Sequence, residues 1–448
     1  MSFLIVIEKT QLSTAVRLAD LEKRMCPYNL DIQVENLNSK IKLYYNHFSE
    51  FKNSVFKTPA GHKNEINSAW AEIQLNTDQG IQITTDPMGQ CPIWFAETAS
   101  YILISPEQKT FSSVVDFEYK YKPNTYYLNI FKRSNQETDF LNIQRLKPGS
   151  VLTYDSTLQF IEKKLPWESF QIENDLTLTE AQDRLKTALL STSMTLAFEN
   201  SCSFLSGGID SSVATCLAKT YSGLTSTYNL KTNRGSEQLE SEETSNYLNI
   251  KSQTLNFNNE KINSYFEKVI YANEIYDGLT AEIILQLEAL IDLTPHSEKN
   301  IFTGYGADLI FGGMLAHKAY LTATGVSDTA SLLDRTYWSK ELSPFYYWSR
   351  GIRLFHTFWN PAVMNAALAI PLSMQEQHQS QKYVLRSMAV KNSWLTEPFA
   401  FRKKLGMTNG TNMNFIFSEH LKLPNEYSYE QKTEIAFKKF KNIFCKIA

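Results

Sequence analysis

The spacing of apolar residues changes partway along the chain, and this change limits the folds open to it. Before the change, short alternating apolar runs such as FLIVIEK, WAEIQL and SYILIS are separated by turns, as is typical of a β-rich region. After it the periods become helical, beginning with Thr177-Leu-Thr-Glu180, which has the pattern of a helix capping box. We predict two domains, residues 1–170 and 171–448, with their boundary between 165 and 176.

The second region alternates strand-like with helix-like segments. CSFLS precedes SSVATCLAKTYS, STYNL precedes SEQLESEETSNYL, and NIFTG follows farther along. Such alternation predicts a parallel sheet wound with helices, in which ligands bind at the carboxyl ends of the strands. The fold class expected for the chain is therefore α/β.

Composition and charge exclude several classes of protein. Hydrophobic residues make up 43% of the 448 residues and charged residues 20%, which excludes a disordered or collagen-like chain. The formal net charge of −3 gives no support for a nucleic-acid or membrane-surface partner. The basic stretch 401–448 has apolar residues at helical spacing, which favours an amphipathic helix. Without an apolar run of membrane-spanning length or a signal-peptide pattern at the start, we expect a cytoplasmic protein.

The cysteines and histidines do not form a recognisable metal or disulfide pattern. The five cysteines are odd in number, scattered and never in CxxC spacing, and the seven histidines show no HExxH or HxH pairing. We therefore expect reduced thiols and no zinc cluster.

A serine- and glycine-rich loop, Ser206-Gly-Gly-Ile-Asp-Ser-Ser212, lies between an apolar run and a helix-forming stretch. Two glycines permit a tight turn, and the amides of the new helix N-terminus favour an anion. The loop differs from the Walker and dinucleotide motifs. It resembles the loop of the N-type ATP pyrophosphatases, which implies release of AMP and pyrophosphate. The nucleotide contacts expected here are Ser206, Gly207, Gly208, Asp210, Ser211 and Ser212.

A second glycine-rich element, from Phe302 to Gly313, follows another strand-like run. Gly304 is expected at the nucleotide, and Asp308 is expected to bind Mg²⁺ together with Asp210. Two carboxylates at two strand ends can hold one Mg²⁺ while phosphate oxygens and water complete its coordination.

With these two motifs, residues 200–420 resemble the asparagine synthetase superfamily, and within it the β-lactam and carbapenam synthetases. Asparagine synthetases typically carry a glutamate in the second motif, where this chain has Tyr305. The β-lactam-forming branch pairs that tyrosine with a downstream glutamate, and Glu341 stands at the matching place. The resemblance implies that Tyr305 and Glu341 form a proton-abstracting pair. A phenol with its ordinary pKa of about 10 is a weak base at neutral pH, so Glu341 and nearby cations must assist.

Three other segments support the same resemblance. Lys404, in the sequence RKKLGMTNG, takes the place of the catalytic lysine, and it is also expected to contact the nucleotide. Lys382 matches a second lysine that contacts phosphate. The stretch 273–282 resembles a substrate-side segment of carbapenam synthetase. Near Lys404, however, Met407-Thr-Asn replaces Ile-His-Glu-like residues of the family, which leaves the substrate open.

The first domain resembles the N-terminal nucleophile (Ntn) glutaminase domain of these synthetases, an αββα fold. The stretch from Asp86 to Ala96 is similar to DPxGxxPLYY, and RLKPG at 145–149 is similar to the RLPPG turn. Active glutaminases have cysteine after the initiator methionine, where this chain has Ser2, and segments like NGEIYN or RGPD are missing. An N-terminal serine can act as a nucleophile, but without these partners we expect a structural remnant.

These observations predict an ATP- and Mg²⁺-dependent amide synthetase that adenylates a carboxylate and closes a β-lactam. Its partner would be a small amino-acid-derived substrate, and a homo-oligomer stays possible. Intermolecular amidation, as in asparagine synthetase, and peptide macrolactam closure, as in lasso-peptide cyclases, remain as alternatives. A different class, a non-catalytic nucleotide-binding module, would not need both glycine motifs together with Asp210, Asp308 and Lys404.

Overall fold

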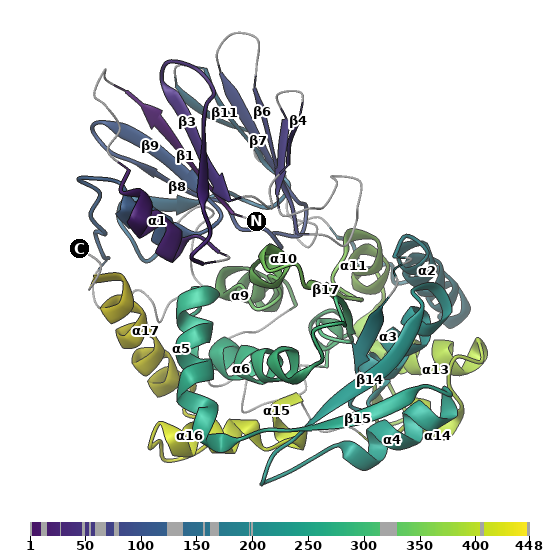
Figure 1. Cartoon of the computed structure of the whole chain (residues 1–448). Helices are drawn as coiled ribbons and strands as arrows, with labels where there is room; N and C mark the ends of the chain where they lie inside the picture. Colours follow the sequence, from purple (N-terminus) through teal and green to yellow (C-terminus); the bar gives the residue numbers. More distant parts are fainter. Residues whose placement is uncertain are drawn as a thin grey trace.

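The computed structural model describes residues 2–9, 16–26, 28–46, 50–52, 55–58, 69–75, 80–122, 138–155, 157–161, 170–196, 198, 200–313, 329–403 and 407–445. Figure 1 shows a β-rich first half, in purple and blue, resting on a larger second half built from helices around a sheet. The predicted boundary near residue 170 lies next to residues outside this description, so the exact domain limits stay a prediction.

The first half contains two six-stranded sheets in which every pair of neighbouring strands is antiparallel. One sheet has the order β10 (Ile143–Arg145), β8 (Trp94–Glu97), β9 (Tyr101–Ser105), β1 (Phe3–Glu8), β3 (Ile41–Asn46) and β2 (Ile32–Asn36). The other has the order β12 (Leu158–Ile161), β11 (Val151–Tyr154), β7 (Ile81–Thr85), β6 (Ala71–Leu75), β5 (Val55–Thr58) and β4 (Glu50–Lys52). The β-rich prediction for this half is confirmed.

The two antiparallel sheets pack face to face because their apolar side chains alternate along each strand. Ile5 and Ile7 of β1 share one apolar cluster with Ile73 and Ile83 of the second sheet. Val6, between them, belongs to a different cluster on the opposite face of its sheet. Alternate side chains of β1 therefore pack into two different apolar clusters, one on each face of the sheet.

The helices described within the first half are α1 (Leu18–Arg24) and the 3₁₀ helix η1 (Gln108–Ser113). The outer helical layers of an αββα sandwich are not shown by the described residues, and the glutaminase-like assignment stays a prediction. Ser2 is completely buried at the start of β1. In this structure the Ser2 hydroxyl is therefore not exposed to an external substrate.

The two motifs that resemble the glutaminase domain lie against each other. The Asp86 carboxylate accepts hydrogen bonds from the amides of Met88 (3.0 Å), Gln90 (2.9 Å) and Cys91 (2.7 Å). The Asp86 carbonyl accepts one from the Gly149 amide (2.8 Å). Both motifs thus shape a buried loop, which reaches the second half.

A five-stranded parallel sheet forms the centre of the second half, as predicted. Its order is β15 (Lys251–Asn256), β14 (Leu224–Lys231), β13 (Ser201–Phe204), β16 (Asn300–Thr303) and β17 (Arg353–His356). The sequence motifs indicated β13, β14 and β16 but missed the outer strands. The sequence of β15, KSQTLN, contains a single large apolar residue, so it lacks the run that marks a buried strand.

Helices surround this sheet (Figure 1). Their bounds are α2 (Leu178–Ser193), α3 (Ile209–Tyr221), α4 (Gln238–Tyr247), η4 (Asn259–Lys261), α5 (Ile262–Ala272), α6 (Gly278–Leu293), α7 (Ala307–Ile310), α9 (Thr329–Ser339), α10 (Phe345–Ser349), α11 (Pro361–Leu368), α12 (Leu372–Gln375), α13 (Tyr383–Lys391), α14 (Glu397–Ala400), α15 (Met407–Gly410), α16 (Met413–His420) and α17 (Tyr429–Cys445). A two-stranded ribbon, β18 (Glu376–Gln377) with β19 (Ser380–Gln381), precedes α13. The capping box predicted at Thr177 and Glu180 is confirmed at the start of α2.

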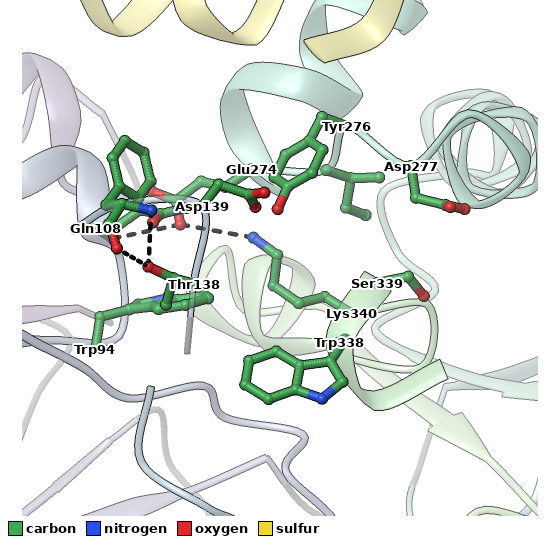
Figure 2. A pocket seen from close by; sticks show the side chains of 12 residues that line it. Trp94, Gln108, Thr138, Asp139, Glu274, Tyr276, Asp277, Trp338, Ser339 and Lys340 are labelled. Carbon is green, nitrogen blue, oxygen red and sulfur yellow. Dashed lines mark hydrogen bonds and ion pairs between the residues drawn. The ribbon is translucent and has the colours of Figure 1, made fainter. Parts of the chain in front are cut away.

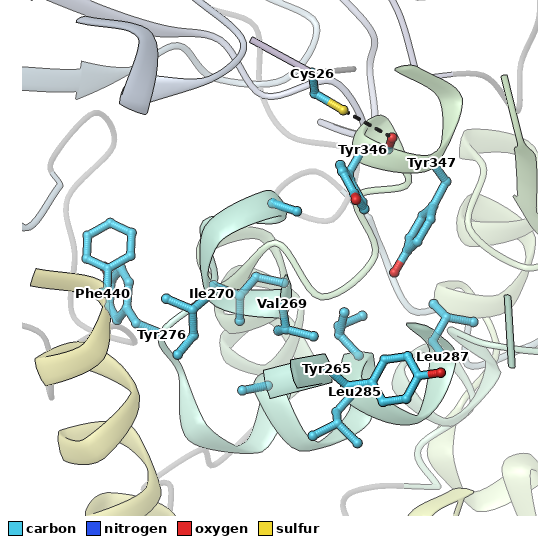
Figure 3. Packing of buried hydrophobic residues seen from close by; sticks show 14 of the residues in the cluster. Cys26, Tyr265, Val269, Ile270, Tyr276, Leu285, Leu287, Tyr346, Tyr347 and Phe440 are labelled. Atoms are coloured by element: carbon cyan, nitrogen blue, oxygen red, sulfur yellow. Dashed lines mark hydrogen bonds between the residues drawn. The ribbon is translucent and has the colours of Figure 1, made fainter. Parts of the chain in front are cut away.

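One apolar cluster joins the two halves. It includes Cys26 from the first half, Val269 of α5, Leu285 of α6, Tyr346 of α10 and Phe440 of α17, and Figure 3 shows these side chains around α5 and α6. The predicted amphipathic C-terminal helix is confirmed, with its apolar face turned into this cluster. The cysteines whose side chains are described are free thiols. Within the described part of the chain, none of the helices has the length and apolar character needed to cross a bilayer.

A buried histidine ties the last strand of the parallel sheet to its neighbour. His356 Nδ1 of β17 lies 2.8 Å from the Thr303 hydroxyl of β16. Burial lowers the pKa of His356 from 6.5 to about 3. Between these values the unfolded chain binds a proton that the folded chain does not. The free energy of unfolding therefore falls as the pH falls from 6.5 towards 3.

We expect the variant His356→Asn to lose this contribution. The slope of unfolding free energy against pH should decrease by up to about 1.4 kcal/mol per pH unit within that window. Denaturant unfolding at a series of pH values measures the slope. The exposed histidine variant His296→Asn is the control and should keep the wild-type slope. A wild-type slope in His356→Asn would contradict a neutral, buried His356.

Candidate nucleotide and catalytic site

The centre of the parallel sheet creates a crevice at the carboxyl ends of β13 and β16. From β13 the chain proceeds outward through β14 to β15, whereas β16 and β17 lie on the other side. Adjacent strands whose connections run in opposite directions leave a gap between their following loops, and ligands of open α/β sheets bind there. Both glycine motifs found in the sequence follow these two strands.

The loop after β13 turns sharply into α3. Gly207 has a φ of +76°, and a Cβ at this position would overlap the backbone of Glu240. The Ser211 hydroxyl holds the turn, accepting from the Ser206 amide (3.2 Å) and donating to the Gly208 carbonyl (3.1 Å). The first amides of α3 are thereby presented at the crevice, in the arrangement that binds phosphate groups.

The second glycine motif lies directly on the first. A Cβ at Gly304 would overlap the backbone of Asp210 and Ser211. Only glycine allows the two loop backbones to approach so closely. This contact brings Tyr305 and Asp308 to the same crevice as the serine- and glycine-rich loop 206–212, the predicted phosphate loop.

Lys382 joins the two predicted metal ligands. Its ammonium group lies 2.6 Å from Asp210 Oδ2 and also forms an ion pair with Asp308 Oδ1. Asp210 and Lys382 are buried, whereas Asp308 is partly exposed. The described residues contain no group of three or more acidic, histidine or cysteine side chains placed to hold a metal. Two carboxylates that converge on one cation are nevertheless a donor set suited to Mg²⁺, which takes its remaining ligands from phosphate and water.

Tyr305 and Glu341, which are 36 residues apart in the sequence, are hydrogen-bonded. The Tyr305 hydroxyl donates to Glu341 Oε1 over 2.6 Å. Glu341 is 4% exposed, and its Oε2 lies 3.4 Å from the hydroxyl of Thr280. Thr280 is itself held by Asp277, the N-cap of α6. The carboxylate therefore has a defined orientation behind the phenol.

A second set of contacts supports the other side of Tyr305. The Tyr305 amide donates to the Thr303 hydroxyl over 3.2 Å. The Tyr305 ring packs edge-on against His356, with 5.6 Å between the ring centroids. Since His356 is neutral, it adds no charge next to the phenol.

A cavity of about 790 Å³, counting its open mouth, lies over the two glycine motifs and is lined by Tyr305. Its size and mixed lining fit a small-molecule site. The predicted residues that line it are Ser206, Asp210, Ser211, Gly304, Tyr305 and Asp308. Its apolar wall comes from Phe204, Leu205, Leu230, Leu287 and Leu290, and further polar groups from Tyr228, Asn229, Glu237, Gln286, Thr303 and Thr411.

The structure places other predicted residues differently. Ser212 is completely buried within α3 and does not line the cavity. Lys404 lies outside the described residues. In the stretch expected on the substrate side, Glu282 instead forms a buried ion pair with Lys432 of α17. Burial raises the pKa of the Glu282 carboxyl, and Lys432 opposes the shift.

Sequence analysis missed the residues that support the Tyr305–Glu341 pair. Thr280 and Thr303 lie within segments that the sequence singled out, but neither was assigned a role, and His356 lies in no motif. The contacts of Thr280 with Glu341 and of Thr303 with His356 join residues far apart in the chain. A capping pattern, Asp277 three residues before Thr280, was the single local signal of this arrangement.

Comparisons with known proteins relate part of the chain to one family. Residues 187–353 match the sequence model of the family described as asparagine synthase. Carboxyethyl-arginine beta-lactam-synthase of Streptomyces clavuligerus is 27% identical over 219 residues. That match covers 48% of this chain and 42% of the relative, which is less than half of the relative's length.

Among solved structures, NMN synthetase from Francisella tularensis has a TM-score of 0.26 and 14% identity, covering 59% of this chain and 94% of that chain. A score this low carries no argument about fold or function. Residues 187–353 are therefore similar to the asparagine synthase family, and about half of the chain is similar to a β-lactam synthetase.

Proposed function

We propose that this protein is an ATP-dependent synthetase that activates a substrate carboxylate as an acyl-adenylate and then closes an intramolecular amide, a β-lactam ring. The observation that carries the proposal is the 2.6 Å hydrogen bond between Tyr305 and Glu341, beside the phosphate loop. The pair places a base where it could accept a proton from an attacking amine. An amine within the substrate must lose a proton as it attacks.

In the first half-reaction the substrate carboxylate attacks the α-phosphate of ATP, and pyrophosphate leaves. The amides at the start of α3 and the ammonium of Lys382 stabilise the negative charge that develops on the phosphates. A Mg²⁺ ion, held by Asp210 and Asp308, would neutralise phosphate charge and orient the leaving group. Gly304 keeps the two loops close enough for one nucleotide to contact both.

In the second half-reaction the substrate amine attacks the activated carbonyl carbon. Tyr305 takes the proton from the amine while its own hydroxyl proton passes to Glu341 Oε1 along the existing hydrogen bond. The C–N bond forms, the bond between the carbonyl carbon and the AMP oxygen breaks, and AMP leaves. Glu341 finishes this step protonated and returns the proton to solvent before the next turnover.

The substrate class is tested by incubating the protein with ATP, Mg²⁺ and β-amino acids related to carboxymethylproline or carboxyethylarginine. We expect stoichiometric AMP and pyrophosphate, and a product lighter than the acid by one water, without an added amine. Aspartate with ammonia or glutamine is the parallel reaction. Asparagine formation would instead support intermolecular amidation. Absence of turnover with every small acid would contradict the proposal and favour a peptide substrate.

We expect Tyr305→Phe and Glu341→Gln to slow ring closure by about 10²- to 10⁴-fold, because each removes the proton path. Substrate-dependent ATP–pyrophosphate exchange, which reports the first half-reaction, should stay near the wild-type rate. Single-turnover product formation and exchange measured on the same preparations separate the two steps. Equal loss of both activities in a folded variant would refute the assignment of this pair to the second step.

Asp210→Asn and Asp308→Asn should reduce Mg²⁺-dependent exchange by about 10²- to 10³-fold, because the site loses charge stabilisation in the first step. The matched control is Asp183→Asn, an exposed carboxylate paired with Lys391 on the surface. It should keep wild-type exchange. Full exchange activity in either site variant would exclude that carboxylate from metal binding.

A further inference from the structure

Glu341 projects from a strained turn. Residues 337–343 comprise the last residues of α9 and the turn that leads towards α10, and within them Lys340 has a φ of +60°, in the left-handed region that a non-glycine residue seldom occupies. Lys340 is nevertheless only 7% exposed. Its carbonyl accepts from the Ser343 amide over 3.1 Å. A conformation of this kind persists only where the surroundings hold it in place.

Residues of the first half form hydrogen bonds with both ends of this segment, at Tyr337 and Ser343. The Arg145 guanidinium donates to the Tyr337 carbonyl over 2.6 Å and stacks on the Tyr337 ring, 3.8 Å from its centroid. The Tyr337 hydroxyl donates to the Leu146 carbonyl over 3.2 Å. At the other end, the Ser343 hydroxyl donates to the Gln90 carbonyl over 2.7 Å. These partners belong to the two glutaminase-like motifs.

The middle of the turn is held by buried charges. Lys340 Nζ lies 3.6 Å from Glu274 Oε2, just before α6, and 5.5 Å from the centroid of the Trp94 ring. Figure 2 shows the Lys340 side chain extending towards Glu274 in a cavity of about 350 Å³ that both halves line. Glu274 in turn accepts hydrogen bonds from the amides of Lys109 (2.8 Å) and Gln108 (3.3 Å) of η1.

The charge of Lys340 depends on this partner. Burial lowers the pKa of Lys340 to about 7, while the Glu274 carboxylate opposes the shift and the cations Arg145 and Lys109 add to it. The Glu274 carboxylate therefore stabilises the charged form of Lys340 in a buried site that water does not solvate.

We propose that the first half acts as a clamp on residues 337–343, and that Lys340, through its ion pair with Glu274, is a positioning residue that keeps Glu341 in hydrogen-bonding range of Tyr305. The contacts run without interruption from η1 through Glu274 and Lys340 to the peptide bond of Glu341. The expected effect on ring closure rests on the proposed function, whereas the expected effect on the turn rests on the contacts alone. It assigns a task to a domain that lacks the expected glutaminase residues.

The structural consequence is tested by hydrogen–deuterium exchange of Lys340→Met and Glu274→Gln. The amides of Lys340, Glu341 and Ser343 donate to carbonyls of residues 336–340 and should exchange faster in both variants. Exchange in residues 203–213, around the phosphate loop, should stay at the wild-type rate. The control is Lys9→Met, which removes a surface ion pair with Glu97. Unchanged exchange in 337–343 would overturn the clamp whatever reaction the protein catalyses.

The catalytic consequence is tested on the same variants by single-turnover ring closure. A displaced Glu341 should slow closure by up to about 10²-fold while ATP–pyrophosphate exchange is retained. The double variant should be no slower than the slower single variant, since both changes break one contact. Ser343→Ala, which removes a hydrogen bond without altering charge, should show a smaller change in the same direction.

The outcomes separate this inference from the proposed function. Normal closure in Lys340→Met, with slow closure in Tyr305→Phe, would overturn the positioning role and leave the proposed function intact. If the wild-type protein closes no β-amino acid, the proposed function fails, while the exchange rates still decide whether the clamp exists. Parallel loss of adenylation and closure in the folded Ser343→Ala variant would also overturn the inference, because a clamp on Glu341 should not affect the first step.

Discussion

The close approach of two loop backbones at the centre of the parallel sheet is the constraint on which the site depends. Gly304 leaves no room for a side chain against residues 210–211. Because the loops touch, the loop before α3 and Tyr305 open into one cavity. A larger residue at Gly304 would have to push the two loops apart.

Charge is organised around that contact in two separate buried groups. At the cavity, the Lys382 ammonium pairs with both Asp210 and Asp308 and reduces the repulsion between the two carboxylates. Behind it, Glu274 and Lys340 lie where the two halves meet. The first group lies at the two glycine motifs, whereas the second contacts the turn that carries Glu341. In the proposed function these groups would serve the first and the second half-reaction respectively.

The two motifs that resemble a glutaminase domain make contacts between the halves. Asp86 and Arg145 belong to motifs that resemble a glutaminase domain, yet their contacts are structural and reach residues near Glu341. Ser2, the residue in the place of a glutaminase nucleophile, is buried. In this structure both motifs therefore contribute to packing between the two halves.

Local patterns in the sequence determined much of the fold and part of the site. Alternating apolar runs marked the strands of the first half, and the capping box at Thr177 marked the start of α2, because these signals act over a few residues. The SGGIDSS loop indicated a phosphate site for the same reason. The pairing of Tyr305 with Glu341 came from family resemblance, since no local rule relates two residues so far apart.

Only the tertiary structure decided how distant residues meet. The outer strand β15 lacks an apolar run and is stabilised by pairing with β14, which no window of its own sequence reveals. Three ion pairs join residues that are 66 to 172 positions apart in the sequence. They are Lys382 with Asp210, Lys340 with Glu274 and Lys432 with Glu282. Such contacts depend on the order of strands and the packing of helices. A local sequence pattern does not specify either, because both arise from the folding of the whole chain.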